Sequence, residues 1–252
     1  MQAFPPRIFP CFACIYGQTG KMWQQDFKSR FGLNDSQLLL LERFCLLLSS
    51  AREINITAIK DESKIIDVLF RDSLVLLDLP EALEAAKAVD IGSGGGIPGM
   101  LLAIARPGLD LTMIEANRKK CAFISKVIEA LGLKNAAALE LRSEEAASSQ
   151  LRDSFDFSVT RAVAPLSAAI EYSLPLVRPG GFALLLRGKR EQDDNGKAKR
   201  AARALNGSID RIVRVSPYDY ATNLHVWLIK KEALTPARFP RKPGMAKKRP
   251  LA

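Results

Sequence analysis

Short apolar runs alternate with amphipathic segments through the middle of the chain. The pattern predicts strands at 86–91, 111–116, 136–141, 155–162, 182–188, 209–218 and 224–231. It predicts helices between the first five at about 98–105, 117–131 and 165–177. Regular alternation of apolar strands with helices indicates a parallel sheet covered on both faces. A short polar turn joins the last two strands, which indicates an antiparallel hairpin at the sheet edge.

The first third of the chain has a helical period instead. The run SQLLLLERFCLLLSSAREI is strongly apolar and too long for a strand, and Asp35 is its expected N-cap. A second helix is predicted over about 62–78. We therefore expect N-terminal helices over 22–80 that pack on a core domain over 81–235. A basic tail follows at 236–252.

Residues 1–21 are rich in proline and aromatic side chains and show no helical period. Arg7 and Pro10 interrupt the apolar run that a secretory signal would need. Two interpretations stay open. Either this segment is a disordered extension, or translation starts at Met22.

Composition narrows the class of protein. The chain has 252 residues, of which 48% are hydrophobic and 25% charged, which are ordinary values for a globular protein. We expect no membrane-spanning helix, because no apolar stretch reaches about 18 residues. We also expect no metal site, because Cys11 and Cys14 form a lone C-x-x-C and His225 is the only histidine. Cys45 and Cys121 are expected in the core of a cytoplasmic protein.

The formal net charge of +10 is concentrated at one end. Beyond residue 186 the chain carries 17 basic and 6 acidic residues, so this last quarter accounts for all of the excess. Such asymmetry indicates contact with a polyanion, first a nucleic acid and second an acidic membrane. A solvated basic surface without a partner is the alternative.

The segment VDIGSGGGIPG, which begins at residue 89, is the most informative motif. Glycines at a strand-to-helix turn let a ligand approach the backbone closely, which suits a cofactor that contains adenosine. Two patterns fit it. G-x-G-x-x-G, typical of dinucleotide binding, uses Gly94, Gly96 and Gly99. D-x-G-x-G-x-G, typical of S-adenosylmethionine-dependent methyltransferases, uses Asp90, Gly92, Gly94 and Gly96. A tight turn without a ligand is the third interpretation.

The context favours the methyltransferase pattern. A dinucleotide pattern in register with the strand end would start at Gly92 and need glycine where Ile97 stands. Glu115 ends the second strand, where a carboxylate can accept hydrogen bonds from ribose hydroxyls. The polar cluster Arg142-Ser143-Glu144-Glu145 follows the third strand and could hold an adenine edge. Glu144 could equally be a plain helix-start residue.

The residues after the fourth strand bear on which atom is methylated. Thr160-Arg161-Ala162 differs from the Asn/Asp-Pro-Pro-Tyr/Phe motif of enzymes that methylate exocyclic amines. Cys121 lies within a predicted helix, so a cysteine nucleophile for a pyrimidine C5 is not in place. What remains is an atom that is already nucleophilic. A ring nitrogen such as guanine N7 has a free lone pair and reacts without a general base.

Several motifs together resemble one family. From about residue 30 to the C-terminus the chain resembles the bacterial 16S rRNA guanine-N7 methyltransferases, also called glucose-inhibited division protein B. The motifs are Asn55-Ile56-Thr57-Ala58-Ile59, Arg71-Asp72-Ser73-Leu74, the glycine segment, Thr160-Arg161-Ala162, and the tail FPRKPG followed by AKKRPL. Residues 1–21 match nothing in the family.

The resemblance implies a fold, a reaction and partners. The fold is α/β: the Rossmann-like S-adenosylmethionine-dependent methyltransferase fold, with a mostly parallel seven-stranded sheet, an antiparallel edge hairpin and an N-terminal helical extension. The reaction is methylation of guanine N7 at position 527, in the 530 loop of 16S rRNA. We expect S-adenosylmethionine as cofactor, 16S rRNA or the small ribosomal subunit as partner, and a monomer.

The resemblance also implies the contacts to the cofactor, which are Gly92, Ile97, Glu115, Ser143, Glu144 and Arg161. Ser143 stands where the family usually has a small apolar residue that makes its contact through the backbone. Arg161 is expected to orient the methionine carboxylate or the RNA, and a structural salt bridge is its alternative role.

Two other functions stay open on the sequence. One is an NAD-dependent oxidoreductase that uses the G-x-G-x-x-G pattern. The other is a non-enzymatic RNA-binding protein with a vestigial cofactor pocket.

The basic tail predicts salt-dependent RNA binding. The candidate phosphate contacts are Arg187, Lys189, Arg190, Arg241, Lys242, Lys247, Lys248 and Arg249. Each neutralised phosphate releases counterions, so affinity for 16S rRNA should fall steeply as salt rises. Filter binding over a salt series measures this, and a flat response would count against the prediction. We expect the tail to be ordered only when RNA or the core domain holds it.

Overall fold

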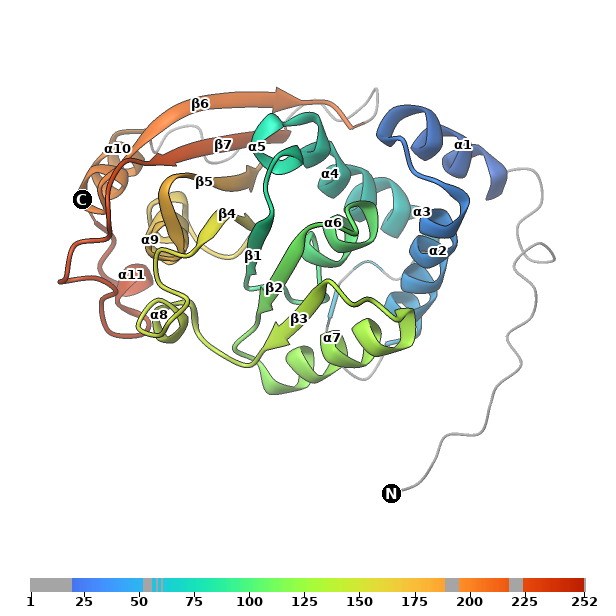
Figure 1. Ribbon diagram of the computed structural model, residues 1–252, viewed down its shortest axis with the longest axis horizontal. Helices are drawn as coiled ribbons and strands as arrows, with labels where there is room; N and C mark the ends of the chain where they lie inside the picture. The colour runs from blue at the N-terminus through green and yellow to red at the C-terminus, as the bar shows by residue number, and fades with distance from the viewer. Residues whose placement is uncertain are drawn as a thin grey trace, which may run out of the picture.

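One seven-stranded sheet organises the molecule (Figure 1). The computed structural model describes residues 20–51, 56–57, 59, 61–188, 195–217 and 224–251. The strand order is β3-β2-β1-β4-β5-β7-β6, in which the first five strands run parallel and β7 pairs antiparallel with both β5 and β6. The predicted fold class, including the antiparallel hairpin at the edge, is therefore confirmed.

The elements lie close to the predicted ranges. The strands are β1 (Lys87–Ile91), β2 (Asp110–Ile114), β3 (Ala136–Leu139), β4 (Phe155–Arg161), β5 (Val177–Arg187), β6 (Gly207–Val215) and β7 (Leu224–Lys231). The α-helices are α1 (Gly20–Phe31), α2 (Asp35–Ser50), α3 (Glu62–Lys64), α4 (Arg71–Leu74), α5 (Pro80–Leu83), α6 (Gly99–Ala105), α7 (Arg118–Leu131), α8 (Ser143–Ala146), α9 (Leu166–Ser173), α10 (Asn195–Ala204) and α11 (Met245–Lys248). A π-helix, η2 (Ile65–Phe70), and two 3-10 helices, η3 (Val75–Asp78) and η4 (Leu174–Leu176), complete the set.

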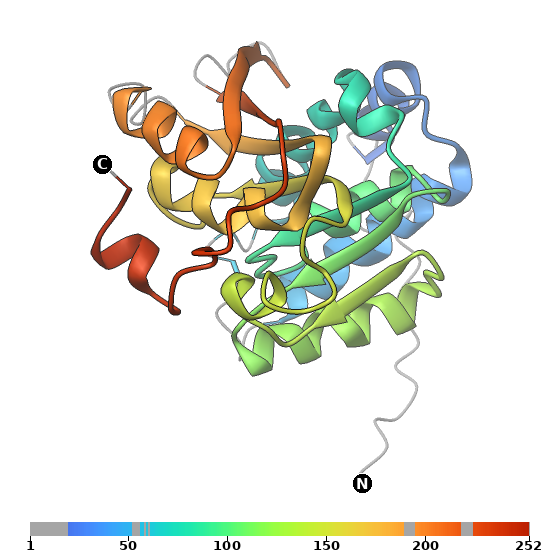
Figure 2. The same cartoon turned by 60° about the vertical axis from the view of Figure 1, so that its left-hand side comes forward.

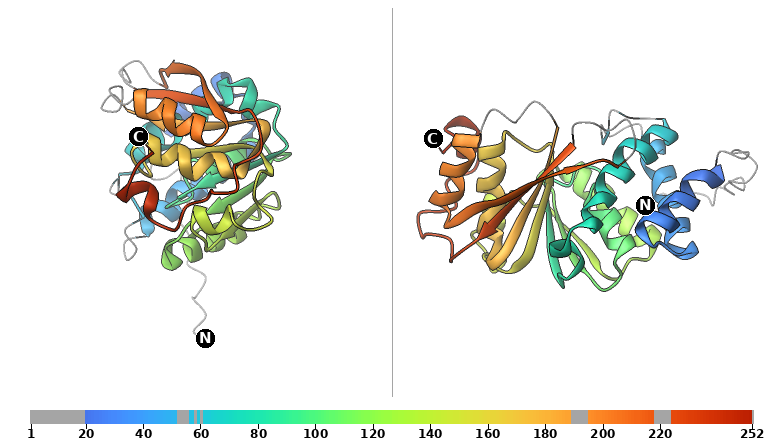
Figure 3. Two further views of the ribbon diagram at one scale, coloured as in Figure 1. Left: turned by 90° about the vertical axis from the view of Figure 1, so that its left-hand side faces the viewer. Right: turned by 90° about the horizontal axis from the view of Figure 1, so that it is seen from above.

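Helices cover both faces of the sheet (Figure 3). Alternate side chains of β5 show how the two faces divide. Leu184 and Leu186 belong to a core shared with α2, α6 and α7, whereas Ala183 and Leu185 pack with α9 and α10. This period of two places apolar side chains on both faces, as a central strand of a covered sheet requires.

The N-terminal helices pack on the same face as α6 and α7, and Trp23 and Phe27 join that core. Helix α2 begins with a capping box. The Asn34 side-chain oxygen accepts from the backbone N–H of Gln37 at 3.0 Å. The Gln37 side-chain oxygen accepts from the backbone N–H of Asn34 at 2.9 Å. The expectation that Asp35 caps this helix is therefore wrong, since Asp35 is already its first helical residue.

The helix predicted over 62–78 spans those residues but is not regular. Ile65–Phe70 is π-helical. The Arg161 guanidinium, from the end of β4, donates to the carbonyls of Val68 at 3.1 Å and Leu69 at 3.2 Å in this segment. A sequence pattern reveals neither the π-helix nor this contact.

The fifth strand also differs from its prediction. The pattern predicts a strand over 182–188, which leaves the glycine-rich segment Pro179–Gly181 outside it. It lies inside β5 instead, which begins at Val177 and carries a register shift against β4. A Cβ on Gly181 would lie 2.3 Å from the carbonyl of Asp156, so only glycine lets the two strands approach there.

A buried carboxylate sets how closely α6 approaches the sheet. Asp90, at the end of β1, is 1% exposed and accepts a hydrogen bond from the Gly99 amide at 3.0 Å. A Cβ on Gly99 would lie 2.8 Å from both Asp90 Oδ2 and Met113 Cγ. The first turn of α6 therefore lies directly against the sheet only because residue 99 has no side chain.

Replacing Gly99 with alanine should destabilise the protein. The added methyl overlaps atoms that a packed core cannot move, so we expect a loss of about 1–3 kcal/mol in the free energy of unfolding. Urea unfolding measures this loss. Gly108→Ala is the matched control because a Cβ there meets nothing within 4 Å, and it should change stability by less than about 1 kcal/mol. Equal stability of the two variants would contradict the packing argument.

Candidate active site

The glycine loop lies at the carboxyl end of β1. The amides of Gly92 and Ser93 both donate to the carbonyl of Ile114, at 2.8 and 3.1 Å, which ties the loop to the end of β2. Gly92 and Gly94 have φ of +68° and +58°, a left-handed conformation that favours glycine. A Cβ on Gly94 would meet nothing closer than 3.9 Å, so the backbone there faces open space.

Glu115 lies beside this loop, at the end of β2. One carboxylate oxygen accepts from the Gly94 amide at 2.9 Å, and the other accepts from the Asn117 amide at 2.8 Å. Asn117 in turn caps α7, because its side chain accepts from the Lys120 amide. The carboxylate is thus oriented by backbone donors, and each oxygen keeps a lone pair for a further donor.

Burial raises the pKa of Asp90 to about 7, with a smaller upward contribution from the charge on Glu115, although hydrogen bonds from the Gly99 amide and the Ser93 side chain lower it in part. Asp90 Oδ1 has no hydrogen-bond partner among the described residues. With no cation beside it, a buried carboxyl keeps its proton to a higher pH than an exposed carboxyl does.

One pocket of about 440 Å³ opens between the ends of β1, β2 and β4 and the start of α8. It brings together five of the six residues expected to contact a cofactor, which are Gly92, Glu115, Ser143, Glu144 and Arg161. Ile97 is not among the lining residues and packs instead against the core that α2 and α6 share.

Glu144 makes a contact that was not expected. Its Oε1 accepts from the amide of Gly244, in the C-terminal segment, at 2.9 Å. Ser143 is buried, and its hydroxyl donates to the other oxygen of Glu144 at 3.2 Å. In this structure both oxygens of Glu144 therefore hold protein groups at the rim of the pocket.

Arg161 lines the pocket and also joins two parts of the molecule. Besides the two carbonyls of η2, it pairs with Asp72 at 3.1 Å. Burial raises the pKa of Asp72 to about 6, and the facing guanidinium lowers it in part. The structural salt bridge considered for Arg161 is present, and it links the N-terminal helices to the end of β4.

The lining residues that were not predicted as cofactor contacts include three with polar side chains, Lys120, Tyr172 and Lys247. Tyr172 lies on α9, where burial raises its pKa and the nearby charges of Glu144 and Glu171 raise it further. Lys247 was expected only as a phosphate contact. The place of Lys120 in the first turn of the helix after Glu115 could have predicted it as a pocket residue. No such signal pointed to Tyr172, because its helical period indicates only a core position.

The pocket fits a cofactor that contains adenosine. Gly94 leaves open space over the backbone, and the Glu115 carboxylate beside it can accept from ribose hydroxyls. Within the described residues, no group of three or more histidine, cysteine or acidic side chains could hold a metal ion. No helix in the described part of the chain is long and apolar enough to cross a membrane.

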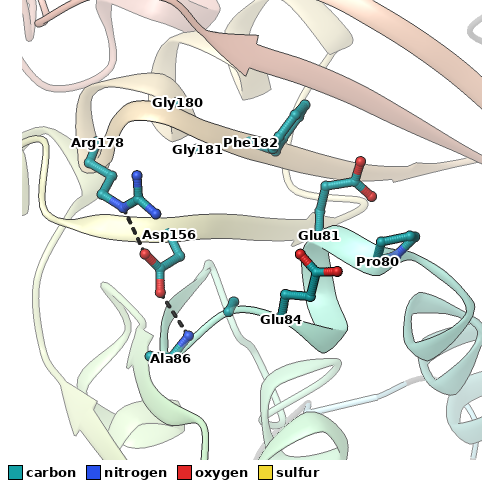
Figure 4. Close-up of a pocket in the computed structure, with 10 residues that line it drawn as sticks. Pro80, Glu81, Glu84, Ala86, Asp156, Arg178, Gly180, Gly181 and Phe182 are labelled. Atoms are coloured by element: carbon teal, nitrogen blue, oxygen red, sulfur yellow. Dashed lines mark hydrogen bonds and ion pairs between the residues drawn. The ribbon is translucent and has the colours of Figure 1, made fainter.

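A second pocket, of about 520 Å³, lies at the opposite end of the parallel strands, where they begin (Figure 4). Asp156 in its wall pairs with Arg178 at 2.7 Å and accepts from the Ala86 and Lys87 amides at 2.8 Å. Its walls come from the amino ends of β1 and β4. Ligands of open α/β sheets bind at the carboxyl ends, so the glycine-loop pocket is the candidate site.

The structure divides the predicted phosphate contacts into groups. Arg187 is 3% exposed and donates to the Ala164 carbonyl, so the expectation of a surface cation there is wrong. Arg241 pairs with the buried Glu171 at 2.6 Å. Lys189 and Arg190 lie outside the described residues. The predicted contacts that are exposed are Lys242, Lys247, Lys248 and Arg249.

Comparison with known proteins decides the family. The family model described as "GidB: rRNA small subunit methyltransferase G" matches residues 37–217. The chain belongs to this family. Among its relatives, the Ribosomal RNA small subunit methyltransferase G of Moorella thermoacetica is 37% identical over 87% of this chain and 92% of its own length. That of Trichormus variabilis is 32% identical over 93% of this chain and 98% of its own length.

These matches confirm the resemblance expected from the motifs, and they support neither an oxidoreductase nor a non-enzymatic RNA-binding protein. Among solved structures, the chain is similar to a SAM-dependent methyltransferase from Aquifex aeolicus. The TM-score is 0.50 at 16% identity, over 67% of this chain and 93% of the other. This likeness concerns the fold alone.

The raised pKa of Asp90 predicts a pH dependence of stability. An ordinary aspartate titrates near pH 3.9, so the folded state retains a proton that the unfolded state loses. The free energy of unfolding should therefore fall between about pH 4 and about pH 7 as Asp90 is forced to ionise. Asp90→Asn removes this titration and should flatten the decline measured by urea unfolding from pH 5 to 8. Asp110→Asn, at an exposed position, should follow the wild type; parallel curves for Asp90→Asn and wild type would contradict the assignment.

Proposed function

We propose that this protein transfers the methyl group of S-adenosylmethionine to N7 of a guanine in the 530 loop of 16S rRNA. It acts as a monomer in the cytoplasm, where small ribosomal subunits are assembled. Membership of the rRNA small subunit methyltransferase G family supports the reaction class. The observation that carries the cofactor is the bond between the Gly94 amide and the Glu115 carboxylate, which places open glycine backbone and an acceptor for ribose side by side.

Four of the lining residues have a role suited to their chemistry. Gly92 lines the pocket, and Glu115 accepts hydrogen bonds from the ribose hydroxyls. Ser143 is buried beside the pocket and contributes mainly its backbone. Arg161 acts as a positioning residue, because it fixes η2 against the end of β4.

The reaction needs alignment more than acid–base chemistry. When bound, S-adenosylmethionine would supply a methyl group on a positively charged sulfur. The lone pair of guanine N7 would take this group as the S–CH3 bond breaks, so that neutral S-adenosylhomocysteine leaves and the positive charge passes to the guanine. The chain's single histidine, His225, lies in β7 and does not line the pocket. Glu115 and Glu144 are both bound to backbone amides. In-line attack without a general base therefore fits this site, and holding the two reactants together can supply about 7–11 kcal/mol.

The exposed tail cations are the proposed RNA contacts. Lys242, Lys248 and Arg249 are exposed, and Lys247 lies both on the tail and in the pocket wall. RNA phosphates bound along this segment would lie next to the cofactor site. A guanine in a structured loop must also be splayed out of its stack to reach the methyl group.

Gly94→Arg should abolish methyl transfer. The new side chain occupies the open space over the loop, and arginine is strained at a φ of +58°. The assay uses labelled S-adenosylmethionine with 16S rRNA or small subunits from a strain that lacks the modification, followed by digestion and nucleoside identification. Wild type should yield 7-methylguanosine, and the surface variant Gly108→Arg should do so at the same rate. Transfer by wild type to another atom, or no transfer at all, would refute the proposal.

A further inference from the structure

The C-terminal segment 235–251 is held against the core at several points. Arg152 donates to the carbonyls of Thr235 and Phe239, both at 2.7 Å. The Phe239 ring is buried in the core formed with α9 and α10. Figure 2 shows the segment running from β7 down past α9 to α11. The first part of the tail is thus anchored without RNA.

The second part of the tail lies beside the candidate active site. Arg241 binds the buried carboxylate of Glu171 through two nitrogens, which anchors the chain just before the turn at Gly244. Ala246, on α11, is 2% exposed and joins the core that contains Ile91 and Ile114, the last residues of β1 and β2. Helix α11 therefore packs at the carboxyl edge of the sheet, near α8 and α9 (Figure 1).

Glu144 connects the turn at Gly244 to the pocket. Its Oε1 accepts from the Gly244 amide at 2.9 Å, and Gly244 has a φ of +81°, so the turn depends on glycine. Gly244 and Lys247 both line the pocket that Glu115 and Arg161 line from the sheet. One wall of this pocket is therefore supplied by the tail.

We propose that Glu144 is a positioning residue for cofactor binding, and that it acts by holding the C-terminal segment as a wall of the pocket. The proposal rests on the proposed S-adenosylmethionine site and adds a route by which the tail contributes to it. Oε1 of Glu144 holds the tail and Oε2 accepts from Ser143, so the carboxylate organises protein groups on both sides. A preorganised wall raises affinity because less ordering is needed on binding.

The test is a double-mutant cycle on cofactor affinity. Deletion of residues 243–252 removes Gly244 and α11 but keeps the Phe239 and Arg241 anchors, so no buried charge is orphaned. Glu144→Ala removes the hold on the tail and leaves the chain complete. Binding of S-adenosylhomocysteine, measured by calorimetry without RNA, gives the dissociation constant of each variant. Glu140→Ala, at an exposed position outside the pocket, controls for the loss of one carboxylate.

If Glu144 acts through the tail, the two changes should not add. The deletion and Glu144→Ala should each weaken binding about tenfold, and the combined variant should also be about tenfold weaker than wild type. Glu144→Gln keeps an oxygen that can accept from Gly244, so it should restore most of the affinity. Glu140→Ala should bind as wild type does.

Two results would overturn the proposal. Undiminished binding by the deletion variant would show that the tail is not part of the site. An equal loss from Glu144→Ala in the complete and the deleted chain would show that Glu144 acts on the cofactor directly. Circular dichroism checks the fold of each variant; if the deletion does not fold, Ala246→Glu in the complete chain displaces α11 instead and should weaken binding equally. Absence of binding by wild type would be a failure of the proposed function itself.

Discussion

The buried carboxylate of Asp90 is the constraint on which the site depends. It accepts from the Gly99 amide and lies where a side chain on residue 99 would overlap it. The first turn of α6 therefore packs directly on β1, and the glycine loop between them must turn sharply. That turn exposes the backbone at Gly94, and it brings the Gly94 amide within reach of Glu115. The loop conformation, the contact between Gly94 and Glu115 and the position of α6 are thus linked through one close contact.

Segments from both ends of the chain pack around the glycine loop and its pocket. From the N-terminal side, Ile56 and Leu48 pack so closely over the loop that a Cβ on Gly95 would lie 2.4 Å from the Ile56 side chain. Arg161 binds the same N-terminal helices to the end of β4. From the C-terminal side, the turn at Gly244 forms a wall. The glycine loop is therefore enclosed by segments that are far apart in sequence, and only the folded chain contains the pocket.

The candidate site was predictable where a residue's role follows from its place at a strand end. Gly92 and Glu115 follow parallel strands, and the carboxyl ends of parallel strands meet at one edge, so the pattern alone places them together. Glu144 also lines the pocket, but its contact with the tail was not predictable, because a hundred residues separate it from Gly244. Ile97 was expected in the pocket from the family resemblance, and its side chain packs in the core instead.

The sequence by itself determined the class of the sheet, the order of its elements and the family. These depend on short-range signals, which are the periods of apolar residues, the glycines and the caps. Tertiary structure alone decided the π-helix at Ile65–Phe70 and the buried pairing of Arg241 with Glu171. Arg161 binds carbonyls of the π-helix and Arg241 binds Glu171, so in both places a charged side chain finds its partner in a distant segment. Burial makes such a charge bind the nearest available carbonyl or carboxylate, and which group is nearest is settled only when the chain has folded.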